Sequence, residues 1–280
     1  MNKKLFLLLF VTLIAVHLTG CATAQTETSA PIPTLTQTPS PIATSTPSGV
    51  PVRLQFIGHD SFLLTAGDGM RIVMDPYRTS YVPIEIQKFP ENLTADIVTV
   101  SQLHPDHAGV ANVGGTPRMI LSPGPDRAGA VEITGYKSDQ GFYDGAPTGE
   151  TTVFVTVFVF KVGGTKIVHM GAAGVITQPD ILAAIEDADV VIIDGMGTDS
   201  HPVPEMMAQL RRSNVRTVIP AHTSFSERER FFGALTVDEF IKTLPPEEVI
   251  NRVDGSAITV TPGMPVQVLI LTPSALTAQQ

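Results

Sequence analysis

The sequence has a single cysteine, few basic residues and, after residue 21, no long uninterrupted apolar run. With only Cys21 present, no disulfide can form within the chain. Lysine and arginine together number 18 against 27 acidic residues, a formal net charge of −9. The absence of a basic stripe argues against nucleic-acid binding. The chain after Cys21 is therefore expected to be a soluble domain.

Residues 1–20 are expected to be a lipoprotein signal peptide that is cleaved before Cys21. Lys3 and Lys4 precede an apolar run that is too short to span a bilayer, as in secretory leaders. The stretch LTGC resembles the lipobox of bacterial lipoproteins, in which the cysteine is lipidated. The alternative is an ordinary secretory signal with a chance cysteine. Lipidation would anchor the protein to a membrane, in the cell envelope and outside the cytoplasm.

Residues 21–50 consist mostly of threonine, serine and proline, with one charge and no aromatic residue. Such a segment cannot bury enough apolar surface to offset its ordering entropy, so we expect a disordered tether, with a glycosylated stalk as the alternative. The composition changes abruptly at Pro51, and residues 51–275 are expected to be the folded domain.

The folded part begins with strands and continues with alternating helices and strands. VRLQFIG, SFLLT and MRIVMD have the alternation of strands, and ADIVTVS is typical of a strand buried on both faces. The run from Thr151 to Gly171 predicts a hairpin that turns at Gly163 and Gly164. QPDILAAIEDAD, PEMMAQLRRSN and TVDEFIKTL predict helices. This order favours a sheet sandwich covered by helices over a doubly wound sheet.

A cluster of polar residues follows the ADIVTVS strand. His104, Asp106 and His107 provide two imidazoles and a carboxylate, which are normal ligands of zinc and related divalent ions. An isolated HxxH pair is more often a polar loop, but the preceding strand and the intervening aspartate favour a metal site here.

Five short stretches resemble the metallo-β-lactamase fold superfamily, particularly the branch of L-ascorbate-6-phosphate lactonase. In chain order they are FIGHDSFLL, IVMDPY, ADIVTVSQLHPDHAG, KIVHMGAAG and TVIPAH. The resemblance covers most of residues 52–272. It implies a mixed α/β fold, an αββα four-layer sandwich, with its active site at one edge of the two sheets.

Members of this family use a His-x-His-x-Asp-His motif, a loop histidine, an aspartate and a last histidine to hold two metals. By resemblance, His104 corresponds to a ligand of one position, here called the first site. Asp106, His107 and His222 correspond to the ligands of the other, here called the second site. The family positions that have lost a ligand residue are Gln102, Ser138 in GYKSDQG, and Ala172, where the bridging aspartate is expected.

These losses predict at most one divalent metal, held at the second site. Zinc is the first expectation, with manganese or iron as alternatives, or no metal at all. His104 is an additional candidate ligand, and His104 or Gln102 could orient water or substrate as catalytic groups. By resemblance, His59, Asp75 and Asp194 are expected to support the ligands from behind.

Three further residues could reach the site, although an ordinary role is favoured for each. Asp139 and His201 are expected to be solvated loop residues, and Asp194 a turn carboxylate. His169 is expected to be a satisfied core histidine.

Two functions remain open at this point. The first is a membrane-anchored, metal-dependent hydrolase of a small-molecule lactone, ester or phosphodiester. The second is a catalytically inactive, surface-displayed binding or scaffolding domain that retains the fold. Whether the chain is an enzyme, its substrate and its oligomeric state are not determined by the sequence.

Overall fold

The computed structural model of the chain describes residues 51–78, 88–142, 153–227, 230 and 233–274, with the backbone alone at 139–142 and 153. The expected signal peptide, Cys21 and the tether lie outside these residues, as does the side chain of Asp139. None of the helices in the described part has the length and apolar composition needed to cross a membrane.

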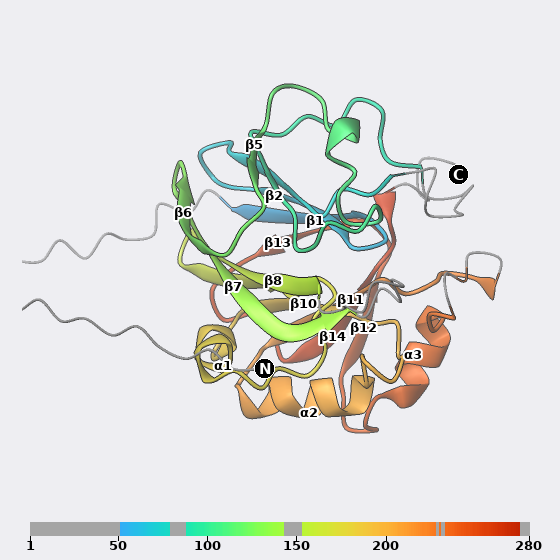
Figure 1. The fold of residues 1–280 in the computed structure, drawn as a ribbon. Helices are drawn as coiled ribbons and strands as arrows, with labels where there is room; N and C mark the ends of the chain where they lie inside the picture. Colours follow the sequence, from blue (N-terminus) through green and yellow to red (C-terminus); the bar gives the residue numbers. More distant parts are fainter. Residues whose placement is uncertain (1–50, 79–87, 143–152, 228–229, 231–232, 275–280) are drawn as a thin grey trace, which may run out of the picture. The chain divides into compact units, whose positions relative to one another are not determined.

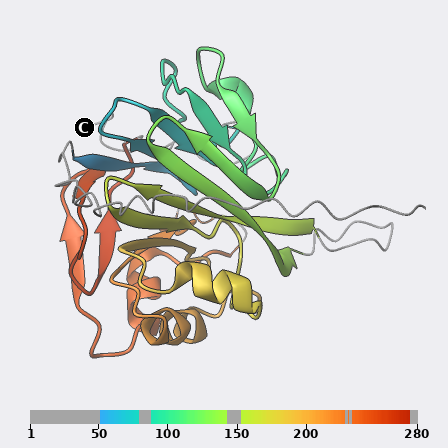
Figure 2. The ribbon, with the colours of Figure 1, turned by 90° about the vertical axis from the view of Figure 1, so that its left-hand side faces the viewer.

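Two β-sheets stack face to face (Figures 1 and 2). The first sheet has six strands, and β13, β1, β2 and β3 are antiparallel whereas β3, β4 and β5 are parallel. Its strands, in spatial order, are β13 (Ala257–Val260), β1 (Val52–Gly58), β2 (Ser61–Thr65), β3 (Arg71–Met74), β4 (Ile97–Thr99) and β5 (Arg118–Ile120).

The second sheet has eight strands, with a parallel half and an antiparallel half. Strands β12, β14, β11, β10 and β9 are parallel, and β9, β8, β7 and β6 are antiparallel. In spatial order they are β12 (Ile250–Val253), β14 (Gln267–Leu271), β11 (Thr217–Ala221), β10 (Val190–Asp194), β9 (Thr165–His169), β8 (Val153–Val162), β7 (Val131–Phe142) and β6 (Gly124–Ala128).

Strand β10 illustrates why the second sheet is buried on both faces. Val190 and Ile192 lie in the core between the two sheets, and Val191 and Ile193 lie in the core under the helices. Successive side chains of a strand point to opposite faces, so a strand covered on both sides is apolar throughout. The predicted β8–β9 hairpin is confirmed, and its turn residues Gly163 and Gly164 both have positive φ.

The helices α1 (Pro179–Ile185), α2 (Val203–Arg212) and α3 (Val237–Thr243) cover the outer face of the second sheet (Figure 1). The predicted capping box of α3 is present, because the Thr236 hydroxyl accepts from the Glu239 amide and the Glu239 carboxylate accepts from the Thr236 amide.

The outer face of the first sheet has a lighter cover than a four-layer sandwich implies. In the described residues its helical part is only the 3₁₀ turn η1 (Val110–Asn112). Tyr77, Phe89 and Val113, which lie outside the strands, pack there on Val73 and Val98. The mixed α/β sandwich is thus confirmed, with a full helical layer on the second sheet.

Candidate metal centre

The site lies where strand ends from both sheets meet. In the first sheet β1, β3 and β4 run in one direction, and in the second sheet β9, β10 and β11 do so. Chemically active residues follow or end these strands, so distant parts of the sequence come together at one edge. They are His59 and Asp60 after β1, Asp75 after β3, Gln102 to His107 after β4, His169 ending β9, Asp194 ending β10, and His222 after β11.

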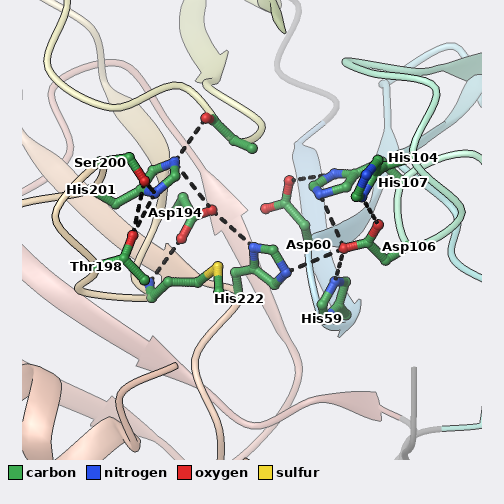
Figure 3. Close-up of polar contacts among 12 residues, drawn as sticks. His59, Asp60, His104, Asp106, His107, Asp194, Thr198, Ser200, His201 and His222 are labelled. Atoms are coloured by element: carbon green, nitrogen blue, oxygen red, sulfur yellow. Dashed lines mark hydrogen bonds and ion pairs between the residues drawn. The ribbon is translucent and has the colours of Figure 1, made fainter. Parts of the chain in front are cut away.

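Three imidazoles converge on one oxygen of Asp106 (Figure 3). The Nε2 atom of His59 lies 3.2 Å from Asp106 Oδ2, and the Nε2 atoms of His107 and His222 each lie 3.6 Å from it. All four side chains are buried, and their ligand atoms lie within 4.8 Å of one another. The structure therefore brings together the three predicted second-site ligands, and it adds His59 to them.

Buried carboxylates hold two of these imidazoles from behind. His107 Nδ1 donates to Asp75 Oδ2 at 2.7 Å, and His222 Nδ1 donates to Asp194 Oδ2 at 2.9 Å. Because a carboxylate only accepts, each Nδ1 carries a proton and each Nε2 faces the cluster. This is the arrangement that sets the tautomer of metal-binding histidines.

The supporting carboxylates are themselves fixed by hydrogen bonds from the backbone. The Ser101 amide donates to Asp75 Oδ1 at 2.7 Å, and the Ser101 hydroxyl donates to Asp75 Oδ2. The Met196 amide donates to Asp194 Oδ1 at 2.8 Å, so Asp194 is also the turn carboxylate that was favoured. Asp75 and Asp194 therefore stand where the predicted supporting role requires them.

The backbone at the site adopts uncommon conformations. Among the described residues other than glycine, His59, Asp75 and His222 are three of five with positive φ, at 54°, 40° and 57°. Each such residue costs about 1–3 kcal/mol and persists only where its surroundings fix it. Here the His222 amide donates to the His59 carbonyl at 2.8 Å, which ties the two histidine backbones together.

The electrostatics of the cluster combine burial with paired charge. Burial lowers the pKa of His222, but Asp194 and Asp106 outweigh it and raise that pKa to about 9. For His107, burial is likewise outweighed by Asp106 and Asp60, and its pKa is raised well above the ordinary value. Burial and the neighbouring His222 lower the pKa of His59 to about 4. Without a metal, protons on His107 and His222 thus balance the buried carboxylates.

Asp60 is a site residue that sequence reasoning missed, although it directly follows His59. Its Oδ2 lies 3.3 Å from His107 Nδ1 and 3.3 Å from His169 Nε2, and none of the three side chains is exposed. Burial would raise the pKa of Asp60, but His169 and His107 lower it below its usual range. His169 was expected to be satisfied, yet its Nδ1 makes no hydrogen bond to any described residue.

A cavity of about 260 Å³ adjoins the second site on the side of the first site. Gln102 and Ala172, two of the lost ligand positions, line it. Ser138, the third of these positions, pairs with Val155 in the antiparallel strands β7 and β8 and does not line the cavity. The full lining is Gln102, His104, Asp106, Ala172, Asp194, Met196, Thr198, Ser200, His201 and His222.

Two histidines contact this cavity in different ways. His104 is partly exposed, and its Nδ1 lies 3.1 Å from Asp106 Oδ1. His201 is buried, so the expectation of a solvated loop residue is wrong. Its Nε2 donates to the Ala172 carbonyl at 2.8 Å, and the hydroxyls of Thr198 and Ser200 each lie 3.0 Å from its Nδ1. No motif marked those two hydroxyls in the sequence.

The donor set of the second site fits a divalent ion. Imidazole nitrogens and a carboxylate oxygen are zinc ligands at about 2.0–2.2 Å, and corners of a tetrahedron of that size lie about 3.3–3.5 Å apart. The three distances to Asp106 Oδ2, 3.2 to 3.6 Å, bracket this spacing. In addition, the buried His107 Nε2 makes no hydrogen bond to any described residue, as expected of an atom that lacks its partner.

In a comparison with known proteins, residues 53–222 match the model of the beta-lactamase superfamily domain. A protein of Carboxydothermus hydrogenoformans named UPF0173 metal-dependent hydrolase is 24% identical over 71% of this chain and 99% of its own length.

Solved structures agree with this match. A Thermotoga maritima protein, described as a candidate Zn-dependent hydrolase of the metallo-beta-lactamase superfamily, is 29% identical. It covers 79% of this chain and 98% of its own, with a TM-score of 0.60. A metallo-hydrolase from Ignicoccus hospitalis, 18% identical, covers 75% of this chain and 99% of its own with a TM-score of 0.54, and it supports the fold alone.

Proposed function

The chain belongs to the beta-lactamase superfamily, and from this premise we propose that it is a hydrolase working with one divalent ion, zinc first, at the second site. Its fold is the mixed α/β metallo-β-lactamase fold with a possible metal site. The observation that carries the proposal is that His107 Nε2 and His222 Nε2 both point toward Asp106 Oδ2. A buried carboxylate holds each of these two rings in that orientation. Manganese and iron are the alternative ions.

At such a site a divalent ion supplies activation of water and polarisation of a carbonyl or phosphoryl oxygen. The residues of the chain supply the rest. Asp75 and Asp194 keep the Nε2 atoms of His107 and His222 aimed at the cluster. The partly exposed His104, at the cavity, is placed to exchange a proton with a bound substrate.

The cavity of about 260 Å³ suits a small-molecule substrate. Thr198 and Ser200 offer hydroxyl groups, and Gln102 an amide, along its wall. The resemblance to L-ascorbate-6-phosphate lactonase adds lactones to the esters and phosphodiesters that should be tested. Because Gln102 and Ala172 stand where the family has ligand residues, we propose a degenerate site with a single ion.

Metal content of the purified full chain tests the proposal. We expect near-stoichiometric zinc, manganese or iron in the wild type and its loss in Asp106→Ala and His222→Ala. Gln102→Ala, at the first site, is the matched control and should retain the ion. No metal at any supplied concentration would contradict the proposal, and so would full retention in both second-site variants. Turnover of ester, lactone and phosphodiester substrates is the following measurement.

The loss of first-site ligands supports a second candidate, a binding or scaffolding domain without hydrolysis. Gln102 and Ala172 replace an imidazole and a bridging carboxylate of the family, and positioning errors in a catalytic site are costly. A chain that binds its metal but turns over no substrate of the three classes would favour this candidate.

We also propose that the protein is a lipoprotein anchored in the cell envelope through Cys21. The basic start, the short apolar run and LTGC support this proposal. In cells, Cys21→Ala should move the protein from the membrane fraction or change its processing. An unchanged membrane fraction and unchanged mass would contradict the anchor.

A further inference from the structure

We infer that His59 is a fourth ligand of the second-site ion, so that three imidazoles and one carboxylate hold it. This inference rests on the proposed metal binding and goes beyond it, because the resemblance to the family gives His59 only a supporting role. It changes the expected site from three protein ligands to four, so water would have to bind the ion as a fifth ligand for the proposed hydrolysis.

The position of the His59 nitrogen carries the inference. His59 Nε2 lies 3.2 Å from Asp106 Oδ2, and the corresponding nitrogens of His107 and His222 lie at 3.6 Å. Thus the His59 nitrogen is as close to the shared oxygen as the nitrogens of both expected ligands. All four donor atoms lie within 4.8 Å of one another, close enough to gather around a single ion.

The surroundings of His59 hold its ring in this place. The His59 carbonyl accepts from the His222 amide at 2.8 Å, and His59 keeps a left-handed backbone with φ of 54°. The two rings meet at right angles, with centroids 3.9 Å apart and an interplanar angle of 84°.

The alternative role is that His59 only donates a hydrogen bond to Asp106 and so orients that carboxylate. However, His104 Nδ1 already lies 3.1 Å from the other oxygen, Asp106 Oδ1, and can fix the carboxylate on its own.

Metal affinity alone does not separate the two roles, because removing a supporting residue also weakens metal binding, by about 10–100-fold. The number of imidazoles bound to the ion does separate them. X-ray absorption of the zinc-loaded full chain counts imidazoles through scattering from their ring carbons, and the visible spectrum of the cobalt-loaded chain reports the number of ligands.

The matched variants are His59→Gln and His201→Gln. A glutamine at residue 59 can still donate to Asp106 but is a poor zinc ligand, and His201 is a buried histidine of the same cavity outside the ligand cluster. We expect three imidazoles in the wild type and in His201→Gln, and two in His59→Gln, with a changed cobalt spectrum only in the last.

Two imidazoles in the wild type would overturn the inference and leave the proposed metal site intact. An unchanged count in His59→Gln would also overturn it. A wild-type chain that binds neither zinc nor cobalt would overturn both. If His59→Gln does not fold, as circular dichroism would show, the wild-type count of three or two still decides.

Discussion

The first and second sites both lie where strand ends of the two sheets meet, but the residues that surround them differ. At the second site, buried carboxylates hold His107 and His222, and these imidazoles face Asp106. At the first site the amide of Gln102 and the methyl group of Ala172 line a cavity. The side-chain oxygen of Gln102 makes no hydrogen bond to any described residue. The difference teaches that the fold orients potential ligands by buried carboxylates at the second site, which is why we place the proposed ion there.

The second site also has an electrostatic requirement that the first lacks. The buried carboxylates of Asp60, Asp75, Asp106 and Asp194 need positive charge nearby, because an unpaired buried charge is strongly destabilising. Protons on the surrounding histidines meet this need in the metal-free protein, and a divalent ion would meet it after displacing them. Substitutions should therefore have large effects at the second site and small effects at the first.

The largest effect is expected from Asp75→Asn. An asparagine must place its amide nitrogen either against His107 Nδ1 or against the Ser101 amide, and both of these are donors, so the hydrogen bonds that hold the His107 ring would be lost. Breaking such a buried pair costs about 3–5 kcal/mol of the free energy of unfolding, and metal affinity should fall about 10–100-fold. Denaturant unfolding and a zinc titration measure the two effects.

Asp126→Asn is the control for Asp75→Asn, since Asp126 pairs with the half-exposed Arg118 far from the cluster. Its effect on the free energy of unfolding should stay below about 1 kcal/mol, with unchanged metal affinity. Equal losses in both variants would mean that Asp75 has no special connection to the metal site.

A smaller effect is expected from Gly171→Ala, at the junction of the two sites. Gly171 has φ of 54°, and an added Cβ would lie 2.4 Å from Ser101 Oγ and 2.5 Å from Ser101 Cβ. Ser101 holds Asp75, so the overlap should disturb the support of His107. We expect a loss of about 1–3 kcal/mol in the free energy of unfolding, together with weaker zinc binding.

Gly263→Ala is the control that separates the effect of backbone strain from the effect of the overlap with Ser101. Gly263 has φ of 73°, and its added Cβ would meet no atom within 4 Å. Its free energy of unfolding should fall only by the cost of a left-handed backbone for alanine, about 1–2 kcal/mol, and its zinc affinity should be unchanged. If Gly263→Ala lost as much affinity as Gly171→Ala, the connection through Ser101 would be wrong.

The fold could be predicted from the sequence because its strands and helices have strong local patterns. Val190 to Ile193 are apolar on both faces, and the predicted capping box at Thr236 is present. The length of β7 was not predicted, because its polar residues and two glycines hide the alternation that its pairing with β8 imposes.

The site could be predicted only in part, because the sequence does not show directly which residues from distant strand ends and loops lie close together in space. The motif gave Asp106 and His107, and the resemblance gave His222. In contrast, Asp60 was missed, and His201 was named as able to reach the site but favoured as a solvated loop residue, because both belong to the site through the meeting of strand ends and loops. The same reason explains why His59 was expected behind the ligands, although its nitrogen lies among them.

The pH dependence of zinc binding sharpens the comparison within the second site. The pKa of His222 is raised to about 9, so binding displaces its proton at neutral pH, whereas His59, with a pKa near 4, has none to lose. Affinity should rise at least about tenfold per pH unit between pH 6 and 8, or about 1.4 kcal/mol. Calorimetry in buffers of different ionisation enthalpy measures the released protons.

In the metal-free protein, the contribution of His222 to the free energy of unfolding should fall as the pH rises, which is opposite to the trend in zinc affinity. A pKa raised from 6.5 to about 9 gives a contribution that is complete below pH 6.5 and is lost as the pH rises through about 9. Denaturant unfolding of the chelator-treated chain at a series of pH values checks this, with His222→Gln as the reference. An affinity that falls between pH 6 and 8 would contradict displacement of a proton from His222.

The smallest effect is expected from Gln102→Leu, at the first site. Gln102 is 5% exposed and its side-chain oxygen is unpaired among the described residues, so the amide contributes little to folding. An apolar side chain of similar size removes the desolvation penalty of that oxygen, which is about 1–3 kcal/mol for a buried unsatisfied group. The free energy of unfolding should therefore stay within about 1 kcal/mol or rise, with unchanged zinc content. A clear loss of stability, or a loss of zinc, would mean that Gln102 binds a buried water or the ion, and the first site would then still take part in metal binding.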